Sequence, residues 1–376
     1  MAKKKVLVDI FYLHVAQTGI KTYIECLCEE IEKNNSDDFE FIVSPSLNEI
    51  RNSSFFKGKT ALWKNLFYQL LYFFRKLVII PWLSIKYNTA IVFSPDILSP
   101  LWSKGIKISV IHDAFFWENP KHYNPLWLKI YLALLKAGLR KNAQVITISE
   151  YSKKQIKKYL KMPSLPVHVV YPSSNIGPKE RSQSQISPIP HPYFLHVGVM
   201  EKRKNLLTLV IAFSELVKKE DFQSFKLVLA GQRGPRKTLD DFDPILDLIH
   251  DLKLEEKVIL PGYVSLGELE NYYHHAFAYV FPSLNEGFGM PILEAFSYGL
   301  PVIIAKQDTL TEVGGEAVIT VKENTPLGFE EAMRKIGEDK ELRNSMTALG
   351  SNRLKKFSSE IFFLSLKDCF RRVLNE

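Results

Sequence analysis

Two glutamates, Glu286 and Glu294, frame the stretch of this 376-residue sequence whose residue types and spacing are best suited to chemistry. Seven residues separate them, and Gly287 and Gly289 are among these seven. The glycines allow the backbone to approach a ligand closely or to adopt positive φ. One glutamate is expected in a loop and the other in the first turns of a helix. The pair can therefore reach two different parts of one bound molecule, with the helix start between them.

The elements around this pair follow from hydrophobic patterning. Residues 279–281 predict a buried strand, and Pro291 suits the first turn of a helix that ends near Gly299. The apolar run 302–304 predicts the next strand, so the segment reads as one βαβ crossover in a parallel sheet. Such sheets bind ligands beyond the carboxyl ends of their strands, where a helix N-terminus offers unpaired N–H groups to phosphate.

Taken separately, Gly-Phe-Gly is compatible with a simple tight turn, and Glu294 with an acid favoured near a helix start. Taken together, residues 286–291 (EGFGMP) followed by 293–295 (LEA) resemble the E-x7-E signature of retaining glycosyltransferases of family 4. The resemblance extends over most of the chain and is strongest from 194 to 315. It implies an α/β fold of the GT-B class, with two Rossmann-like, doubly wound parallel-sheet domains facing across a cleft.

A second cluster of candidate residues follows the predicted strand 193–197. Arg203 and Lys204 precede a helix expected from Leu206, and two cations at a helix start oppose its dipole unless an anion binds there. A solvated loop is the alternative, and Lys202 is expected to be solvated. Arg203 and Lys204 match the family's diphosphate clamp. The resemblance thus implies that the donor diphosphate is bound by Arg203, Lys204, Gly19, Gly287, Phe288, Gly289 and Met290.

The resemblance also implies the remaining site residues. His112 follows the predicted strand 106–111 and matches a strand-end histidine that contacts the transferred sugar, whereas Asp113 is expected to be structural. Glu286 is expected near the sugar, and the nucleoside is assigned to Glu294, Tyr263 and Val264. The catalytic pair is therefore Glu286 and His112. Front-face departure, in which the leaving phosphate accepts the acceptor's proton, is favoured over covalent catalysis by Glu286.

Neither a metal ion nor a bound cofactor is expected, and the nucleotide-diphosphate sugar is a substrate. His274 and His275 are adjacent, which is unlike the spacing of metal ligands on a helix. The D-x-D string in residues 240–243 precedes a helix expected at 244–252 and is interpreted as a charged loop or helix cap. Three cysteines without a metal-type spacing favour free thiols in a reducing compartment.

The predicted organisation has two domains and a linker. Residues 1–172 form the acceptor-side domain, to which a C-terminal helix at 357–376 returns, and residues 193–356 form the nucleotide-sugar domain. Residues 173–192 are rich in Ser and Pro and read as the linker. At the N-terminus, we expect a strand at 5–10, a loop at 11–19 ending in Gly19, and a helix at 20–33.

The net charge of +8 points to an anionic partner or simply to a lysine-rich surface. Residues 52–87 interleave aromatic, aliphatic and basic side chains. They suit either a pair of core helices with solvated lysines or a surface lying in an anionic membrane interface. An uninterrupted membrane span is not expected, because Arg75 and Lys76 break the apolar run 66–85.

The resemblance is closest to bacterial mannosyltransferases of polysaccharide and O-antigen (lipopolysaccharide) assembly. It implies GDP-mannose as the favoured donor and a saccharide or lipid-linked saccharide acceptor at the inner face of the cytoplasmic membrane. A UDP- or dTDP-sugar donor remains an alternative, as does a non-catalytic saccharide-binding protein with the same fold. The E-x7-E string opposes an epimerase or a phosphorylase. Nucleic acid is not an expected partner, since only net charge suggests it.

Overall fold

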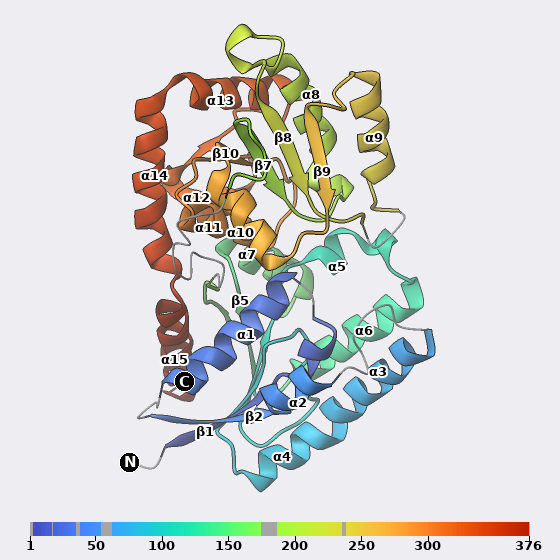
Figure 1. The fold of residues 1–376 in the computed structure, drawn as a ribbon. Coiled ribbons are helices and arrows are strands. Elements are labelled where there is room, and N and C mark those ends of the chain that lie inside the picture. Colours follow the sequence, from blue (N-terminus) through green and yellow to red (C-terminus); the bar gives the residue numbers. More distant parts are fainter. Residues whose placement is uncertain are drawn as a thin grey trace. The chain divides into compact units, whose positions relative to one another are not determined.

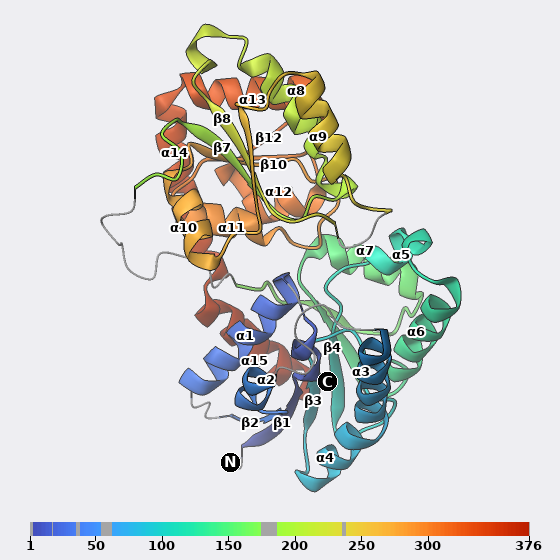
Figure 2. The same ribbon diagram turned by 45° about the vertical axis from the view of Figure 1, so that its right-hand side comes forward.

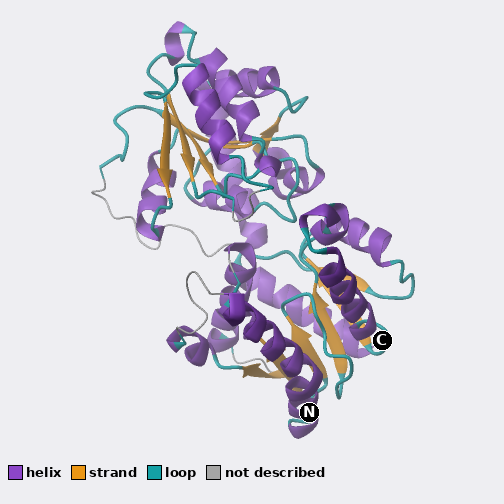
Figure 3. Cartoon of the chain, turned by 90° about the vertical axis from the view of Figure 1, so that its right-hand side faces the viewer, coloured by secondary structure: helices purple, strands orange, loops and turns teal. Residues whose placement is uncertain are grey.

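The computed structural model describes residues 3–16, 18–34, 38–53, 62–173, 186–234 and 238–375. The chain forms two compact units. The first comprises Met1–Asn175 and Ser358–Glu376, and the second comprises Ile176–Phe357. Each unit contains one parallel sheet covered by helices, as Figures 1, 2 and 3 show. Two parallel sheets, each in its own unit and covered by helices, confirm the predicted α/β fold class with two doubly wound domains.

The first unit is built on a six-stranded sheet in the order β2-β1-β3-β4-β5-β6, and every neighbouring pair is parallel. Its strands are short apolar runs that the buried interior of an α/β unit favours. Their bounds are β1 Lys4–Asp9, β2 Phe39–Ser44, β3 Ile91–Ser94, β4 Ile106–Val110, β5 Ala143–Thr147 and β6 Val167–Val169. The helices are α1 Thr18–Lys33, α2 Leu47–Asn52, α3 Leu62–Phe74, α4 Ile80–Lys86, α5 Phe115–Glu118, α6 Pro125–Gly138, α7 Glu150–Leu160 and α15 Ser359–Asn375.

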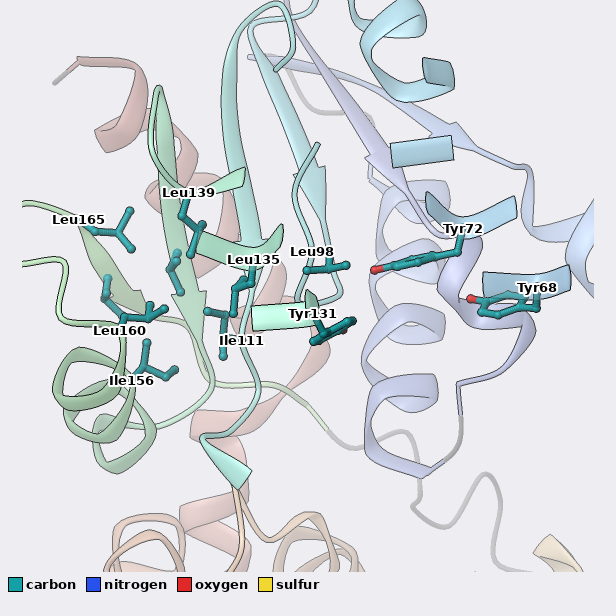
Figure 4. Packing of buried hydrophobic residues seen from close by; sticks show 12 residues of the cluster. Tyr68, Tyr72, Leu98, Ile111, Tyr131, Leu135, Leu139, Ile156, Leu160 and Leu165 are labelled. Atoms are coloured by element: carbon teal, nitrogen blue, oxygen red, sulfur yellow. The ribbon is translucent and has the colours of Figure 1, made fainter. Parts of the chain in front are cut away.

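Both faces of the first sheet are buried. On one face, Leu7 of β1 and Val92 of β3 pack against Ile80 and Leu83 of α4. Farther along that face, Tyr68 and Tyr72 of α3 join residues of α6 and α7 in a second cluster, shown in Figure 4. On the other face, Phe93 of β3 meets Phe370 of α15, with ring centroids 5.3 Å apart. The C-terminal helix therefore belongs to the core of the first unit.

The second unit repeats this plan with the strand order β12-β11-β10-β7-β8-β9, again all parallel. Its strands are β7 Tyr193–Val197, β8 Lys226–Ala230, β9 Val258–Gly262, β10 Ala278–Phe281, β11 Val302–Ile304 and β12 Val318–Thr320. Its helices are α8 Leu206–Leu216, α9 Phe242–Asp251, α10 Leu266–His275, α11 Met290–Ser297, α12 Asp308–Gly314, α13 Pro326–Glu338 and α14 Lys340–Leu354. The βαβ crossover predicted around Glu286 is β10-α11-β11, and it is confirmed.

The structure differs from the sequence-based expectation at two places. Gly19 does not end a loop: α1 begins at Thr18, so Gly19 lies in its first turn, and a short 3-10 helix at Phe11–His14 occupies part of the expected loop. Residues 62–86 form one continuous helical stretch instead of a pair, because α3 runs through a π-helical turn, η2 Arg75–Ile79, directly into α4. Residues 54–61 of the segment, and most of the predicted linker (174–185), lie outside the described residues.

Candidate functional site

The candidate site of the second unit lies at the carboxyl edge of its sheet, where the loops after β7 and β10 meet. These strands are hydrogen-bonded neighbours, so their following loops leave the sheet side by side. The backbone N–H of Leu284 donates to the carbonyl of Arg203 at 2.8 Å, and the hydroxyl oxygen of Ser283 lies 3.2 Å from the same carbonyl. Segments far apart in the sequence are thereby fixed against one another.

Glu286 is the centre of this site, because both predicted cations contact its carboxylate. Lys204 Nζ lies 2.6 Å from Oε1, and Arg203 Nη1 lies 3.0 Å from Oε2. The Ser283 hydroxyl adds a hydrogen bond of 2.6 Å to Oε1. Burial alone would raise the pKa of Glu286, but the Lys204 ammonium and the Arg203 guanidinium outweigh it and lower the pKa to about 2. The carboxylate is therefore ionised at neutral pH.

The two cations differ in exposure. The side chain of Arg203 is 29% exposed, and it also pairs with Glu201 through Nε at 2.8 Å. This exposure leaves part of the guanidinium-bearing side chain accessible, while Nε and Nη1 bond to Glu201, Asn285 and Glu286. Lys204 is only 8% exposed and lies 5.0 Å from the centre of the Phe281 ring. Burial lowers the pKa of Lys204 despite the opposing effect of Glu286.

The start of α11 provides the expected backbone geometry. Gly289 precedes the helix with φ of +101°, and a Cβ built there would lie 2.9 Å from Cδ2 of Leu310. Both facts require glycine at this position. Pro291 lies in the first turn, where a proline costs no hydrogen bond. Phe288 is buried, and its ring packs edge-on against that of Phe357 with centroids 5.8 Å apart, so it anchors the loop in the protein interior.

Glu294 occupies a different environment from Glu286, although both come from the same crossover. The Tyr273 hydroxyl of α10 donates to Glu294 Oε2 at 2.8 Å. Burial raises the pKa of Glu294 to about 7, against the lowering effect of that hydrogen bond. Near neutral pH the group is thus divided between its protonated and ionised forms. Glu286 offers only acceptors, whereas Glu294 also offers a proton.

His196 was missed by the sequence reasoning. It is buried in β7, and its Nδ1 lies 3.0 Å from the carbonyl of Val280, which fixes Nδ1–H as the donor. Burial and the neighbouring Lys204 lower the pKa of His196 to about 3, so the ring is neutral. Within the described residues its Nε2 has no hydrogen-bond partner. The sequence feature that could have identified His196 is its position one residue before the end of a predicted strand.

The structure does not bring every predicted residue to this cluster. Tyr263 and Val264 follow β9, and Tyr263 is 76% exposed, as a base-stacking or a merely solvated residue would be. Gly287 and Met290 are half-buried beside Glu286 and at the first position of α11. In the segment 240–243, which was interpreted as a charged loop or helix cap, Asp240 and Asp243 form ion pairs with the nearby Arg233. Across the described ranges, no three His, Cys, Asp or Glu side chains gather as metal ligands would.

His112 and Gly19 belong to the first unit. His112 follows β4, its Nε2 lies 3.1 Å from the carbonyl of Pro95, and its ring meets Tyr23 edge-on at 5.2 Å. Burial lowers the pKa of His112, so it is neutral at pH 7. Asp113 accepts the N–H of Phe115 at 3.0 Å, in keeping with a structural role. Gly19 is exposed, and no atom lies within 4 Å of a Cβ built on it.

The same edge of the first sheet carries a buried cluster that the sequence reasoning did not predict. Lys76 Nζ lies 3.0 Å from Asp9 and 2.9 Å from Asp96, and Arg75 Nε lies 2.8 Å from Asp9. Asp9 is the last residue of β1, and Asp96 follows β3. The two cations come from the π-helical turn η2. The sequence did contain a sign of this cluster, because Arg75 and Lys76 interrupt an otherwise apolar helix.

Comparison with known proteins finds a matching family model, related sequences and similar folds. Residues 179–353 match the family model described as glycosyl transferases group 1. O-antigen chain mannosyltransferase B of Escherichia coli is 27% identical over 260 residues, which cover 67% of each chain. O-antigen chain mannosyltransferase RfbU of Salmonella typhimurium is 28% identical over 232 residues, which cover 60% of this chain and 59% of that protein. A sucrose-phosphate synthase from Thermosynechococcus elongatus shares the fold over both full lengths, with a TM-score of 0.70 at 18% identity.

Proposed function

The chain belongs to the glycosyl transferases group 1 family, and from this premise we propose that it transfers mannose from GDP-mannose to a saccharide or lipid-linked saccharide acceptor, with retention of the anomeric configuration. The product would serve cell-surface polysaccharide synthesis. The observation that carries the proposal is the contact of Glu286 with both Arg203 and Lys204 beside the start of α11. The similarity to two O-antigen mannosyltransferases supports mannose as the sugar.

In this proposal the donor diphosphate binds the partly exposed side chain of Arg203, Lys204 and the N–H groups at the start of α11. Negative charge grows on the diphosphate as the glycosidic bond breaks, and fixed cations stabilise that charge more in the transition state than before it. No metal ion is assigned to this step, because Arg203 and Lys204 already supply positive charge.

Glu286 would face the sugar as a fixed anion. With a pKa of about 2 it is a weak base, which suits the stabilisation of positive charge at the anomeric carbon better than proton abstraction. The leaving phosphate would accept the acceptor's proton on the same face, which gives retention. Glu294, which can donate or accept a hydrogen bond near neutral pH, suits the two ribose hydroxyls. His112 of the first unit is proposed to contact the sugar.

The first test is a thermal-shift series of the purified protein with GDP, UDP, dTDP and their sugar conjugates, without added metal. A ligand at a hundred times its dissociation constant should stabilise the folded protein by roughly 2.7 kcal/mol. We expect GDP and GDP-mannose to give the shift and Arg203→Ala to abolish it. Lys202→Ala, a neighbouring exposed cation, is the matched control. A shift with only UDP or dTDP compounds would overturn the choice of donor.

Activity is tested separately, by GDP release in the presence of saccharide acceptors and by NMR of the product's anomeric proton. Nucleotide binding without transfer to any acceptor, and with Glu286→Gln matching wild type in a complementation assay, would favour the saccharide-binding alternative. An inverted product would contradict the proposed front-face mechanism.

A further inference from the structure

The outer face of the helical stretch 63–86 in the first unit is apolar along its whole length. The exposed side chains recur every three or four residues, as expected for one face of a helix. Trp63, Leu66 and Leu70 are 60%, 64% and 61% exposed. The full stripe comprises Trp63, Leu66, Phe67, Leu70, Phe74, Leu77, Val78, Trp82 and Ile85. Figures 1 and 2 show α3 and α4 running along the edge of this unit.

The opposite face of the same stretch is anchored in the protein. Tyr68 and Tyr72 point into the hydrophobic cluster of Figure 4. Farther along, Arg75 and Lys76 are held by the buried carboxylates of Asp9 and Asp96. The stretch is long and apolar enough to cross a membrane by composition alone. Crossing would remove two cations from these buried ion pairs, which is costly. The helix therefore suits a position on a membrane rather than across it.

Helix α6 lies beside α3 and also exposes apolar side chains. The indole N–H of Trp127 donates to the side-chain oxygen of Gln69 at 3.3 Å, which fixes α6 beside α3. Leu126 and Ile130 are exposed on α6, and both views in Figures 1 and 2 place the two helices side by side. Exposed apolar side chains thus occur on two neighbouring helices. Scattered exposed apolar residues need no explanation, but nine of them along one helical face mark an interaction site.

The charges on this surface have one sign. Residues 62–86 and 125–138 contain no Asp or Glu. Lys86 lies at one end of the stripe, 5.1 Å from the centre of the Trp82 ring, and Lys64 lies at the other end, 5.9 Å from that of Trp63. Lys129 and Lys136 are exposed on α6. Lysines beside tryptophans at the ends of an apolar stripe are typical of helices that lie in a membrane interface.

We propose that this surface, formed by the outer faces of α3, η2, α4 and α6, binds the interface of a lipid bilayer that contains anionic headgroups. The apolar stripe inserts between the headgroups, and the four lysines contact the anionic lipids. A dimer that used this surface in both copies would bring like charges together, whereas an anionic bilayer neutralises them. The inference goes beyond the proposed function and does not depend on the identity of the donor. Binding to such a bilayer would also account for the location expected from the sequence, at the inner face of the cytoplasmic membrane.

The test is flotation of the full chain with vesicles of phosphatidylcholine alone or of phosphatidylcholine mixed with phosphatidylglycerol. Wild type should bind the mixed vesicles. The double variant Leu66→Gln/Leu70→Gln should lose binding while keeping its nucleotide-induced thermal shift, because both side chains are exposed. The matched control, Leu266→Gln/Leu327→Gln, removes two exposed leucines from the second unit and should bind as wild type does.

The contribution of charge is tested with Lys64→Gln/Lys86→Gln. Each lysine near an anionic surface contributes about 1 kcal/mol, so the pair should weaken binding to mixed vesicles roughly thirtyfold. Folded wild type that binds neither kind of vesicle would overturn the proposal. So would binding that the leucine variant leaves unchanged. Concentration-dependent self-association that the leucine variant abolishes, without vesicle binding, would assign the surface to a second copy instead.

Discussion

The two units place ion-pair clusters at equivalent edges of their sheets, yet the clusters differ in accessibility. Around Lys76 of the first unit, all four charged side chains are less than 10% exposed, and their pairs are closed by hydrogen bonds to Ser94 and Tyr72. Around Glu286 of the second unit, the side chain of Arg203 is 29% exposed. A closed cluster fixes a helix in place, whereas an open cluster can exchange its internal anion for a ligand. The same residue types therefore serve structure in one unit and suit binding in the other.

The comparison predicts the largest stability loss in the closed cluster. Asp9→Asn leaves Arg75 and Lys76 buried with one carboxylate fewer, so unfolding should become easier by about 3–5 kcal/mol. The matched control, Glu40→Gln, removes the exposed ion pair with Lys5 and should cost less than about 1 kcal/mol. Thermal unfolding of both variants gives the measurement. Equal effects of the two substitutions would contradict a structural role for the closed cluster.

In the open cluster, the expected loss is in turnover. Glu286→Gln removes the internal anion while keeping the shape, so the rate of sugar transfer should fall at least about a hundredfold. Nucleotide affinity should hold or increase, because Arg203 and Lys204 lose a competing partner. Initial rates and nucleotide titrations separate the two effects. Weaker nucleotide binding with unchanged turnover would reverse the roles assigned to Glu286 and the two cations.

The two glutamates of the crossover should affect stability in opposite directions as pH changes. The pKa of Glu294 is about 7 in the folded protein, above its unfolded value, so its contribution is lost as pH rises from about 4.5 to 7. The loss is on the order of 3 kcal/mol. Glu286, with a pKa of about 2, contributes fully above the unfolded pKa and loses that contribution as pH falls toward 2.

Glu294→Gln should therefore flatten the pH dependence of Tm between about pH 4.5 and 7. Glu270→Gln, on the neighbouring helix α10, is the control and should leave the slope unchanged. An identical slope in wild type and Glu294→Gln would show that Glu294 does not titrate in this range.

The smallest effects are expected from alanine substitutions at one glycine of each unit. Gly289→Ala forces a side chain into positive φ and against Leu310, which should destabilise the protein by about 1–3 kcal/mol. Gly19→Ala meets open space in the first turn of α1, so stability should hold or rise by about 0.5–1 kcal/mol. A loss of transfer activity in folded Gly19→Ala would support its predicted place against the donor phosphate. Full activity would remove Gly19 from the site.

Local patterning determined much of this protein. Apolar runs, Pro291 and Gly299 predicted the β10-α11-β11 crossover. These features depend on residues close in sequence, so spacing suffices to find them. The resemblance around Glu286 identified the family for the same reason, because its motif is contiguous.

Only the tertiary structure decided how those residues are used. Arg203 and Lys204 were predicted to bind phosphate, but both contact Glu286, and the contact of Lys204 joins positions 82 residues apart, through the pairing of β7 with β10. The pKa values of Glu286 and Glu294 diverge because one lies beside two cations and the other is buried beside Tyr273. Likewise, composition left residues 52–87 open between core and surface. The pairing of Arg75 and Lys76 with Asp9 and Asp96 decided which face of the helix turns inward, since buried charges need partners that only the folded sheet brings within reach.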